Sequence, residues 1–259
     1  MRQLSVSVSK RIRCAVITGG VLLAAMNSSS AFAACPVAGV TFAALETALQ
    51  NAVNAGNGGL GFDMWATIVD RDGVVCLVAK SGAAGEQWPG SRVISAQKAN
   101  TANAFSLPGF ALSTANLFSA TQPGGSLFGL QESNPVDTAV AYVGSSATWG
   151  TAADNLVGQK IGGVNVFGGG LGLYDEDGAL VGGLGVSGDT SCADHNIAWR
   201  VREALDLDHV PSGVAPAGND GIIYDVTGGH GNFASKSGFG HPLCGGTEND
   251  VAASIGAGG

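Results

Sequence analysis

Residues 64–79 read MWATIVDRDGVVCLVA, and this stretch decides the fold. Two runs rich in β-branched, apolar and aromatic residues flank the polar segment 70–73, which ends in Gly73. β-branched and aromatic residues favour strands, and Asp followed by Gly favours a tight turn. The stretch therefore predicts a β-hairpin. A second hairpin is predicted at 164–186, where residues 175–178 repeat the pattern Asp-x-Asp-Gly of the first turn.

Helices are predicted before, between and after the two hairpins. Thr41 can cap a helix that runs to about residue 53, residues 91–105 lack Gly and Pro, and residues 189–205 place apolar side chains on one face. Two hairpins supply four antiparallel strands, and helices must cover a sheet to bury their apolar faces. The sequence thus predicts an α/β protein of the α+β type, with a mainly antiparallel sheet flanked by helices.

Two segments lie outside this regular pattern. The glycine-rich insert 106–162 is expected to hold a short helix near 114–120 and a strand at 137–142. Beyond the domain predicted at 34–208, the Gly- and Pro-rich tail 209–259 contains one strand-like piece, 221–226, and is expected to pack on the domain.

The composition excludes several classes of protein. Of 259 residues, 45% are hydrophobic and only 12% are charged, which is unlike a disordered chain. The 42 glycines show no three-residue period, so the chain is not collagen-like. Eight basic and twenty acidic residues follow residue 33, giving a net charge of −12. An excess of this sign repels nucleic acid and anionic lipid, so neither is expected as a partner.

The N-terminus has the layout of a secretory signal peptide. Four basic residues precede a short apolar run at 15–26, and small residues at 31–33 follow it. The run is too short to span a bilayer, so we predict cleavage after Ala33, no stable membrane anchor and a periplasmic or secreted protein.

Four cysteines remain after that cleavage: Cys35, Cys76, Cys192 and Cys244. An even number suits two disulfides in an oxidising compartment. We favour the pairs Cys35–Cys76 and Cys192–Cys244, because each ties a terminal segment to a predicted core element. A zinc site is the alternative, but no two cysteines have the spacing of a zinc knuckle. Lipidation of Cys35 is a second alternative, and it would leave one thiol unpaired.

Four segments resemble the GlcG/HbpS family, whose members are described as haem-binding. They are ATIVDRDGVV at 66–75, ISAQKANTA at 94–102, FGGG at 167–170, and VGGLGVSG at 181–188 followed by ADHNIA at 193–198. Their order and spacing agree with the family over roughly residues 40–206. The resemblance implies a sheet of about five strands between helices, a haem ligand and assembly into homo-oligomers.

The resemblance also implies a ligand pocket between three of these segments. Its expected ligand-binding residues are Lys98, Thr101, Phe167, Gly168, Gly169, Gly170, Asp194 and His195. Haem iron needs an axial donor such as histidine, and we take His195 and His241 as candidates, because a Cys192–Cys244 bridge would bring them together. Alternatives remain open: Lys98 pairs with an acid, His195 is an internal hydrogen-bonding residue, or the tail only covers the pocket.

Other chemistries have weaker support. The glycine cluster 167–170 lacks a following helix, so a nucleotide cofactor is not expected. No Gly-x-Ser-x-Gly sequence supports a serine hydrolase at 186–191, and the acidic turn 175–177 lacks the full spacing of a calcium loop. The sequence therefore predicts an exported protein that binds haem or a related ligand. The alternatives are a lyase, hydrolase or haem-degrading enzyme using the same cleft, and an oligomeric structural or stress protein.

Overall fold

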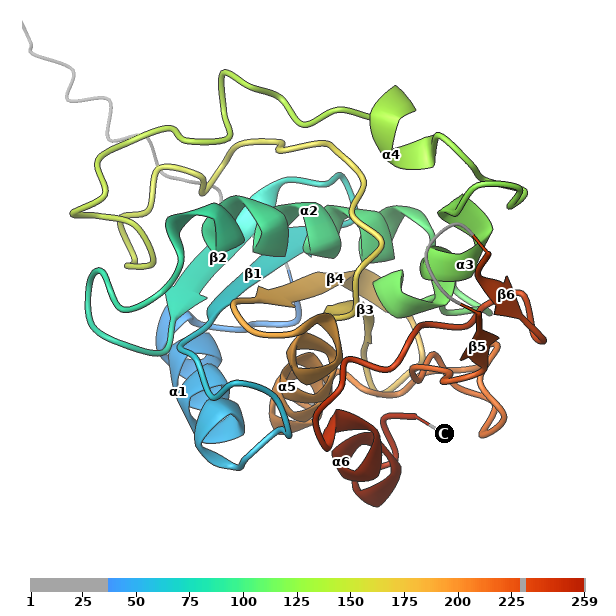
Figure 1. The fold of residues 1–259 in the computed structure, drawn as a ribbon. Helices are drawn as coiled ribbons and strands as arrows, with labels where there is room; N and C mark the ends of the chain where they lie inside the picture. The colour runs from blue at the N-terminus through green and yellow to red at the C-terminus, as the bar shows by residue number, and fades with distance from the viewer. Residues whose placement is uncertain (1–36, 229–231, 259) are drawn as a thin grey trace, which may run out of the picture. The chain divides into compact units, whose positions relative to one another are not determined.

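The computed structural model describes residues 37–228 and 232–258, and its centre is a four-stranded antiparallel sheet. The strand order is β2-β1-β4-β3 (Figure 1). The strands are β1 (Trp65–Asp70), β2 (Val75–Lys80), β3 (Gly170–Tyr174) and β4 (Leu180–Ser187). Both predicted hairpins and the α+β class are confirmed, although the central sheet has four strands among the described residues where about five were expected.

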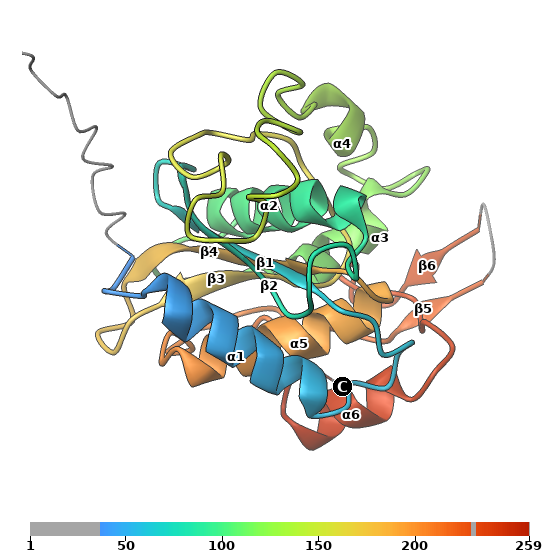
Figure 2. The same ribbon diagram turned by 90° about the vertical axis from the view of Figure 1, so that its left-hand side faces the viewer.

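Helices cover both faces of this sheet. Helix α2 (Pro89–Ala104) lies on one face, and helices α1 (Phe42–Asn54) and α5 (Ser191–Ala204) lie side by side on the other (Figure 2). Thr41 begins α1 as predicted, because its side chain accepts a hydrogen bond from the Ala44 N–H at 3.2 Å. Apolar side chains from α1, α5 and the sheet form the largest core cluster.

Helix α2 approaches β4 so closely that glycine is required on the strand. A Cβ atom on Gly185 would overlap the carbonyl oxygen of Ser95 and lie 2.5 Å from the amide nitrogen of Ala99. The glycines of β4 therefore set the spacing between helix and sheet. This close contact positions Lys98 of α2 against β4 and α5.

We expect Gly185→Ala to lower the free energy of unfolding by about 1–3 kcal/mol, because α2 must move away from β4. Urea denaturation would measure this loss. Gly90→Ala in the first turn of α2 is the matched control: a Cβ there meets no atom within 4 Å, so alanine should be neutral or stabilising. Equal stability of the two variants would contradict the close-contact argument.

The insert 106–162 covers the outer side of α2 (Figure 1). It contains a 3₁₀ helix, η1 (Thr114–Leu117), and the short helices α3 (Phe118–Thr121) and α4 (Leu130–Ser133). The strand predicted at 137–142 is wrong. There the Asp137 carboxylate accepts the Ala139 N–H at 2.9 Å, which favours a turn. A buried ion pair between Arg92 of α2 and Asp154 anchors the insert, with Nε to Oδ2 at 3.0 Å.

The tail packs beside α5. It contains β5 (Val226–Thr227), β6 (Ala234–Ser235) and α6 (Glu248–Ser254). The predicted strand at 221–226 is mostly irregular: Ile222 forms a single bridge to Gly258, and β5 begins only at Val226. The predicted signal peptide 1–33 and Cys35 lie outside the described residues. Among the described residues, no helix combines the length and apolar character needed to span a membrane.

Candidate functional site

Lys98 and Asp194, both predicted to bind ligand, form a buried ion pair between α2 and α5. The Lys98 Nζ lies 2.6 Å from Oδ2 of Asp194 and donates a second hydrogen bond to the Val186 carbonyl at 3.0 Å. Burial lowers the pKa of Lys98, and burial raises the pKa of Asp194 to about 6. The charge of Asp194 raises the pKa of Lys98, and the charge of Lys98 lowers the pKa of Asp194, so each partly offsets the effect of burial on its partner. In this conformation Lys98 therefore directs its charge at Asp194.

The predicted glycine loop packs directly on the first turn of α5. The Gly168 N–H donates to Ser191 Oγ at 2.7 Å, and a Cβ on Gly168 would lie 3.1 Å from that of His195. Gly169 has φ +107°, and a Cβ there would lie 2.9 Å from Asp194 Cβ. The glycine backbone at 168–169, which was expected to receive a ligand, packs against α5 instead. Phe167 projects outward and is 43% exposed.

Threonines from two other segments hold this loop in place. The Thr114 hydroxyl of η1 donates to the Phe167 carbonyl and accepts the Gly170 N–H at 2.8 Å. Thr101, a predicted site residue, accepts the Asn165 N–H at 3.0 Å. Nothing in the sequence distinguishes Thr114 from other threonines of the insert, which explains why sequence reasoning missed it.

His195 lies at the centre of the cluster and is fully buried. Its Nε2 is 3.1 Å from the carbonyl oxygen of Ala257, a tail residue, and its Nδ1 has no hydrogen-bond partner among the described residues. Burial lowers the pKa of His195 to about 4. The ring is therefore neutral at pH 7. If Nε2–H donates to Ala257, the lone pair of Nδ1 remains available to a ligand.

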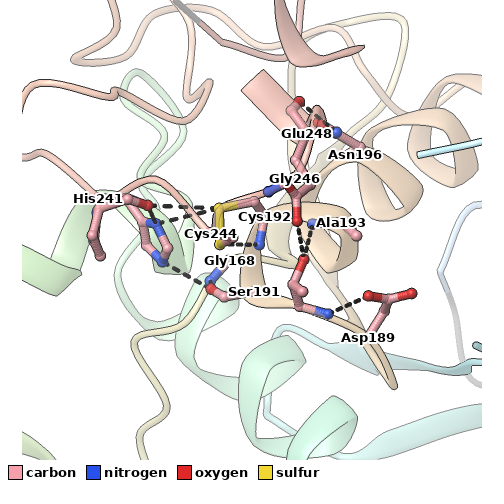
Figure 3. The surroundings of a disulfide bond; sticks show 12 residues. Gly168, Asp189, Ser191, Cys192, Ala193, Asn196, His241, Cys244, Gly246 and Glu248 are labelled. Atoms are coloured by element: carbon pink, nitrogen blue, oxygen red, sulfur yellow. Dashed lines mark hydrogen bonds between the residues drawn. A yellow bond between two sulfur atoms is a disulfide. The ribbon is translucent and has the colours of Figure 1, made fainter. Parts of the chain in front are cut away.

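His241 reaches the same turn of α5 from the tail (Figure 3). Its Nε2 lies 2.8 Å from Ser191 Oγ, and its Nδ1 lies 2.7 Å from the Pro242 carbonyl. These partners fit a tautomer in which Nδ1–H donates to Pro242 and Nε2 accepts from Ser191. Burial lowers the pKa of His241 to about 4, so this ring is also neutral at pH 7.

A disulfide fixes the tail at this position. Cys192 and Cys244 are bonded with a sulfur–sulfur distance of 2.05 Å, the pairing favoured from the sequence (Figure 3). Cys244 Sγ also accepts the Cys192 N–H at 3.2 Å. Cys76 is disulfide-bonded as well, and Cys35, its predicted partner, lies outside the described residues. Because both sulfurs of the 192–244 bridge are in a disulfide, they offer no thiolate to a metal beside His241.

The structure thus brings the predicted residues into contact with one another and with the tail. Besides the disulfide, the tail contacts the cluster through hydrogen bonds that include Ala257 with His195, His241 with Ser191, and Glu248 with Thr190. Ser191 and Ala257 were missed from the sequence, and a backbone carbonyl such as that of Ala257 has no sequence signature.

Comparison with known proteins identifies the family. The family model described as "Haem degrading protein HbpS-like" matches residues 40–203 of the 259. The chain belongs to the HbpS-like family. The match covers the sheet and helices α1, α2 and α5, and it ends before the tail. No curated protein matches the chain.

Three solved structures that are similar to this HbpS-like chain are each less than 25% identical to it in sequence. The Klebsiella pneumoniae protein ORFY is 24% identical, with a TM-score of 0.43 over 64% of this chain and 90% of that one. A PduOC:haem complex is 23% identical, with a TM-score of 0.44 over 65% and 94%. A double mutant of Streptomyces reticuli HbpS is 20% identical, with a TM-score of 0.37 over 64% and 86%.

The two buried histidines predict a pH dependence of stability. Unfolded histidine takes up a proton near pH 6.5, whereas His195 and His241 do so only near pH 4. Between these values the unfolded state binds more protons, so stability should fall as pH drops, by at most about 1.4 kcal/mol per pH unit for each histidine. Asp194 has the opposite effect, because its folded pKa of about 6 exceeds the ordinary 3.8. Between these values it makes the folded state bind more protons, which offsets the contribution of one histidine.

Urea unfolding at pH 7, 6 and 5 would measure this dependence. His241→Gln should reduce the slope, because one of the two histidine contributions is removed. His209→Gln is the control, since His209 is an exposed histidine whose partner Asp206 is also exposed. A wild-type slope that His241→Gln leaves unchanged would contradict the assignment.

Proposed function

We propose that this protein binds haem outside the cytoplasm, at the cluster formed by α2, the glycine loop and the start of α5. Membership of the HbpS-like family supports the ligand class. The observation that carries the site is His195, a buried neutral imidazole whose Nδ1 lacks a partner among the described residues. Neutral imidazole nitrogen is the form that binds iron.

The closed cluster supplies a donor atom but does not fit a haem macrocycle. Gly168 lies against His195 on one side, Ala257 caps its Nε2, and the Trp199 ring centroid is 6.0 Å from that of His195. Haem binding at His195 therefore requires displacement of the tail that includes Ala257. The Cys192–Cys244 disulfide holds that tail, so we propose that it controls access to the site.

A haem titration of the disulfide-bonded and the reduced protein would test this proposal through the haem absorption band. We expect a shifted band that saturates near one haem per chain and develops faster after reduction. His195→Ala should abolish the shift with little loss of fold, whereas His209→Ala, at an exposed site, should not. No shift in either redox form would contradict the proposal, and normal binding by His195→Ala would exclude this axial ligand.

Export is part of the same proposal. It is supported by the N-terminal pattern and by the use of cysteines in disulfides. Mass spectrometry of protein recovered outside the cytoplasm should show a chain that begins at residue 34 and carries two disulfides. A full-length cytoplasmic chain would contradict it. Light scattering of the same sample tests the homo-oligomer implied by the family resemblance.

Haem degradation is a second candidate, because the matching family model describes haem-degrading proteins. Chromatography of the pigment after incubation with a thiol reductant and air would separate the two candidates. Intact haem supports binding alone, whereas open-chain products that His195→Ala does not form support degradation at this site.

A further inference from the structure

Three side chains that can bind a metal meet where the tail crosses the start of α5: Cys192, His241 and Cys244 (Figure 3). One ligand atom of each lies within 4.8 Å of the other two, and His241 Nδ1 is 3.8 Å from Cys192 Sγ. In a tetrahedral zinc site, the bond lengths to sulfur and nitrogen place these two atoms roughly 3.6 Å apart. The surroundings of the disulfide therefore come close to the geometry of a zinc site.

The disulfide occupies both sulfurs, and reduction frees them. Cys244 is the partly exposed member of the pair, whereas Cys192 is buried. A thiolate of a dithiol reductant can therefore attack Cys244 Sγ, which breaks its bond to Cys192 Sγ. The second thiol of the reductant then releases Cys244 from the mixed disulfide. The protein gains two electrons and two protons, and the reductant leaves as its own disulfide.

The start of α5 favours the thiolate form of cysteine, which is the form that binds zinc. Cys192 is the second residue of this 14-residue helix, and a helix N-terminus stabilises negative charge. The Cys192 N–H also donates to Cys244 Sγ at 3.2 Å. Both sulfurs thus lie where the helix lowers the free energy of a thiolate.

His241 can supply the third ligand once its ring proton moves to Nε2. In the disulfide-bonded form, Nδ1 lies 2.7 Å from the Pro242 carbonyl and Nε2 lies 2.8 Å from Ser191 Oγ. Ser191 Oγ has two lone pairs, and the Gly168 N–H takes one of them. The other can accept Nε2–H, which leaves Nδ1 free for a metal. Zinc-binding histidines almost always donate their second ring N–H in this way.

The tail segment that carries two of these ligands can adjust its position. His241 and Cys244 are separated by two residues, a spacing found in pairs of zinc ligands. Leu243 and Gly245 on either side of Cys244 are exposed, and Gly245 has φ +99°, which glycine adopts without strain. After reduction, Cys244 can therefore move away from its former partner and make room for the metal.

We propose that the reduced protein binds a zinc ion through Cys192, His241 and Cys244, with a water molecule in the fourth position. Binding displaces the two thiol protons into solvent. The disulfide and the zinc ion are then alternative links between the tail and α5, and a thiol reductant selects between them. The zinc site does not use His195, the proposed haem ligand, so either proposal can fail without the other.

Titration of the reduced protein with Co²⁺ would test the proposal, because cobalt bound by thiolates in a tetrahedral site absorbs strongly in the visible range. The full exported chain is reduced with a dithiol, separated from it without oxygen, and titrated with Co²⁺ and then with Zn²⁺. We expect the absorption to saturate near one metal per chain in the reduced protein only. Zinc should displace cobalt with a Kd of about 1 µM or tighter. Zinc, but not magnesium, should also restore the resistance of the reduced tail to protease.

His241→Gln retains the disulfide, so its fold can be checked before reduction, and it should weaken zinc binding about tenfold or more. Cys244→Ser should abolish the cobalt absorption. His209→Gln is the matched control and should bind normally, because His209 belongs to a separate exposed cluster of possible ligands with Asp206 and Asp208. Three results would each overturn the proposal: no cobalt absorption in the reduced wild type, equal absorption in the oxidised protein, or zinc binding that His241→Gln leaves unchanged.

Discussion

Asp220→Ala is expected to lower the free energy of unfolding by about 3–5 kcal/mol, the typical cost of leaving a buried charge without its partner. Asp220 holds Arg202 of α5 with two hydrogen bonds of 2.8 Å, and both side chains are almost fully buried. The same guanidinium donates to the Gly172 carbonyl at 3.1 Å and lies 4.6 Å from the Trp199 ring centroid. Arginine stays charged at every pH of interest, so it cannot relieve the loss by releasing a proton.

Urea denaturation measures this effect, and two controls define its origin. Asp208→Ala removes an exposed carboxylate nearby and should change stability by less than about 0.5 kcal/mol. The double variant Arg202→Met with Asp220→Leu should recover most of the loss, because no unpaired charge remains. A loss below about 1 kcal/mol in Asp220→Ala would show that the pair does not hold the tail to α5.

Asp194→Ala provides an informative comparison. It leaves Lys98 buried without its partner, but burial already lowers the pKa of this lysine, so it can become neutral. We therefore expect a smaller loss than in Asp220→Ala.

Cys244→Ser is expected to lower the free energy of unfolding by about 2–4 kcal/mol, because the bridge closes a long loop in the unfolded chain. The bonded residues are 52 apart in the sequence. The same variant should release the segment that carries His241, and it should therefore take up haem faster than the disulfide-bonded wild type under the proposed function. Denaturation and limited proteolysis of the tail would follow the two effects.

The control for this variant is reduction of the wild type. A thiol reductant should make the wild-type tail as sensitive to protease as that of Cys244→Ser, and it should change tail cleavage in the variant little. Equal stability and equal protease resistance of the oxidised wild type and the variant would show that the tail is held without the bridge.

Local patterns in the sequence determined the framework of this protein. The two hairpins follow from strand-forming runs on either side of Asp-x-Asp-Gly turns, and α1 follows from Thr41 and the apolar spacing after it. These signals are local, because strand and helix propensities and turn chemistry depend on neighbouring residues. The strand predicted at 137–142 failed for a related reason: the turn formed by Asp137 outweighed the strand preference of the residues after it.

The sequence also predicted that Lys98, the glycine loop, Asp194, His195 and His241 come together, and in the structure they converge on the start of α5. What it did not determine is whether that region is open. Only the tertiary structure shows that Asp194 neutralises Lys98 and that Ala257 covers His195. These pairs are 96 and 62 residues apart. Contacts at such separations depend on how the insert and tail pack over the domain, and buried polar groups take whichever partner that packing brings within hydrogen-bond distance.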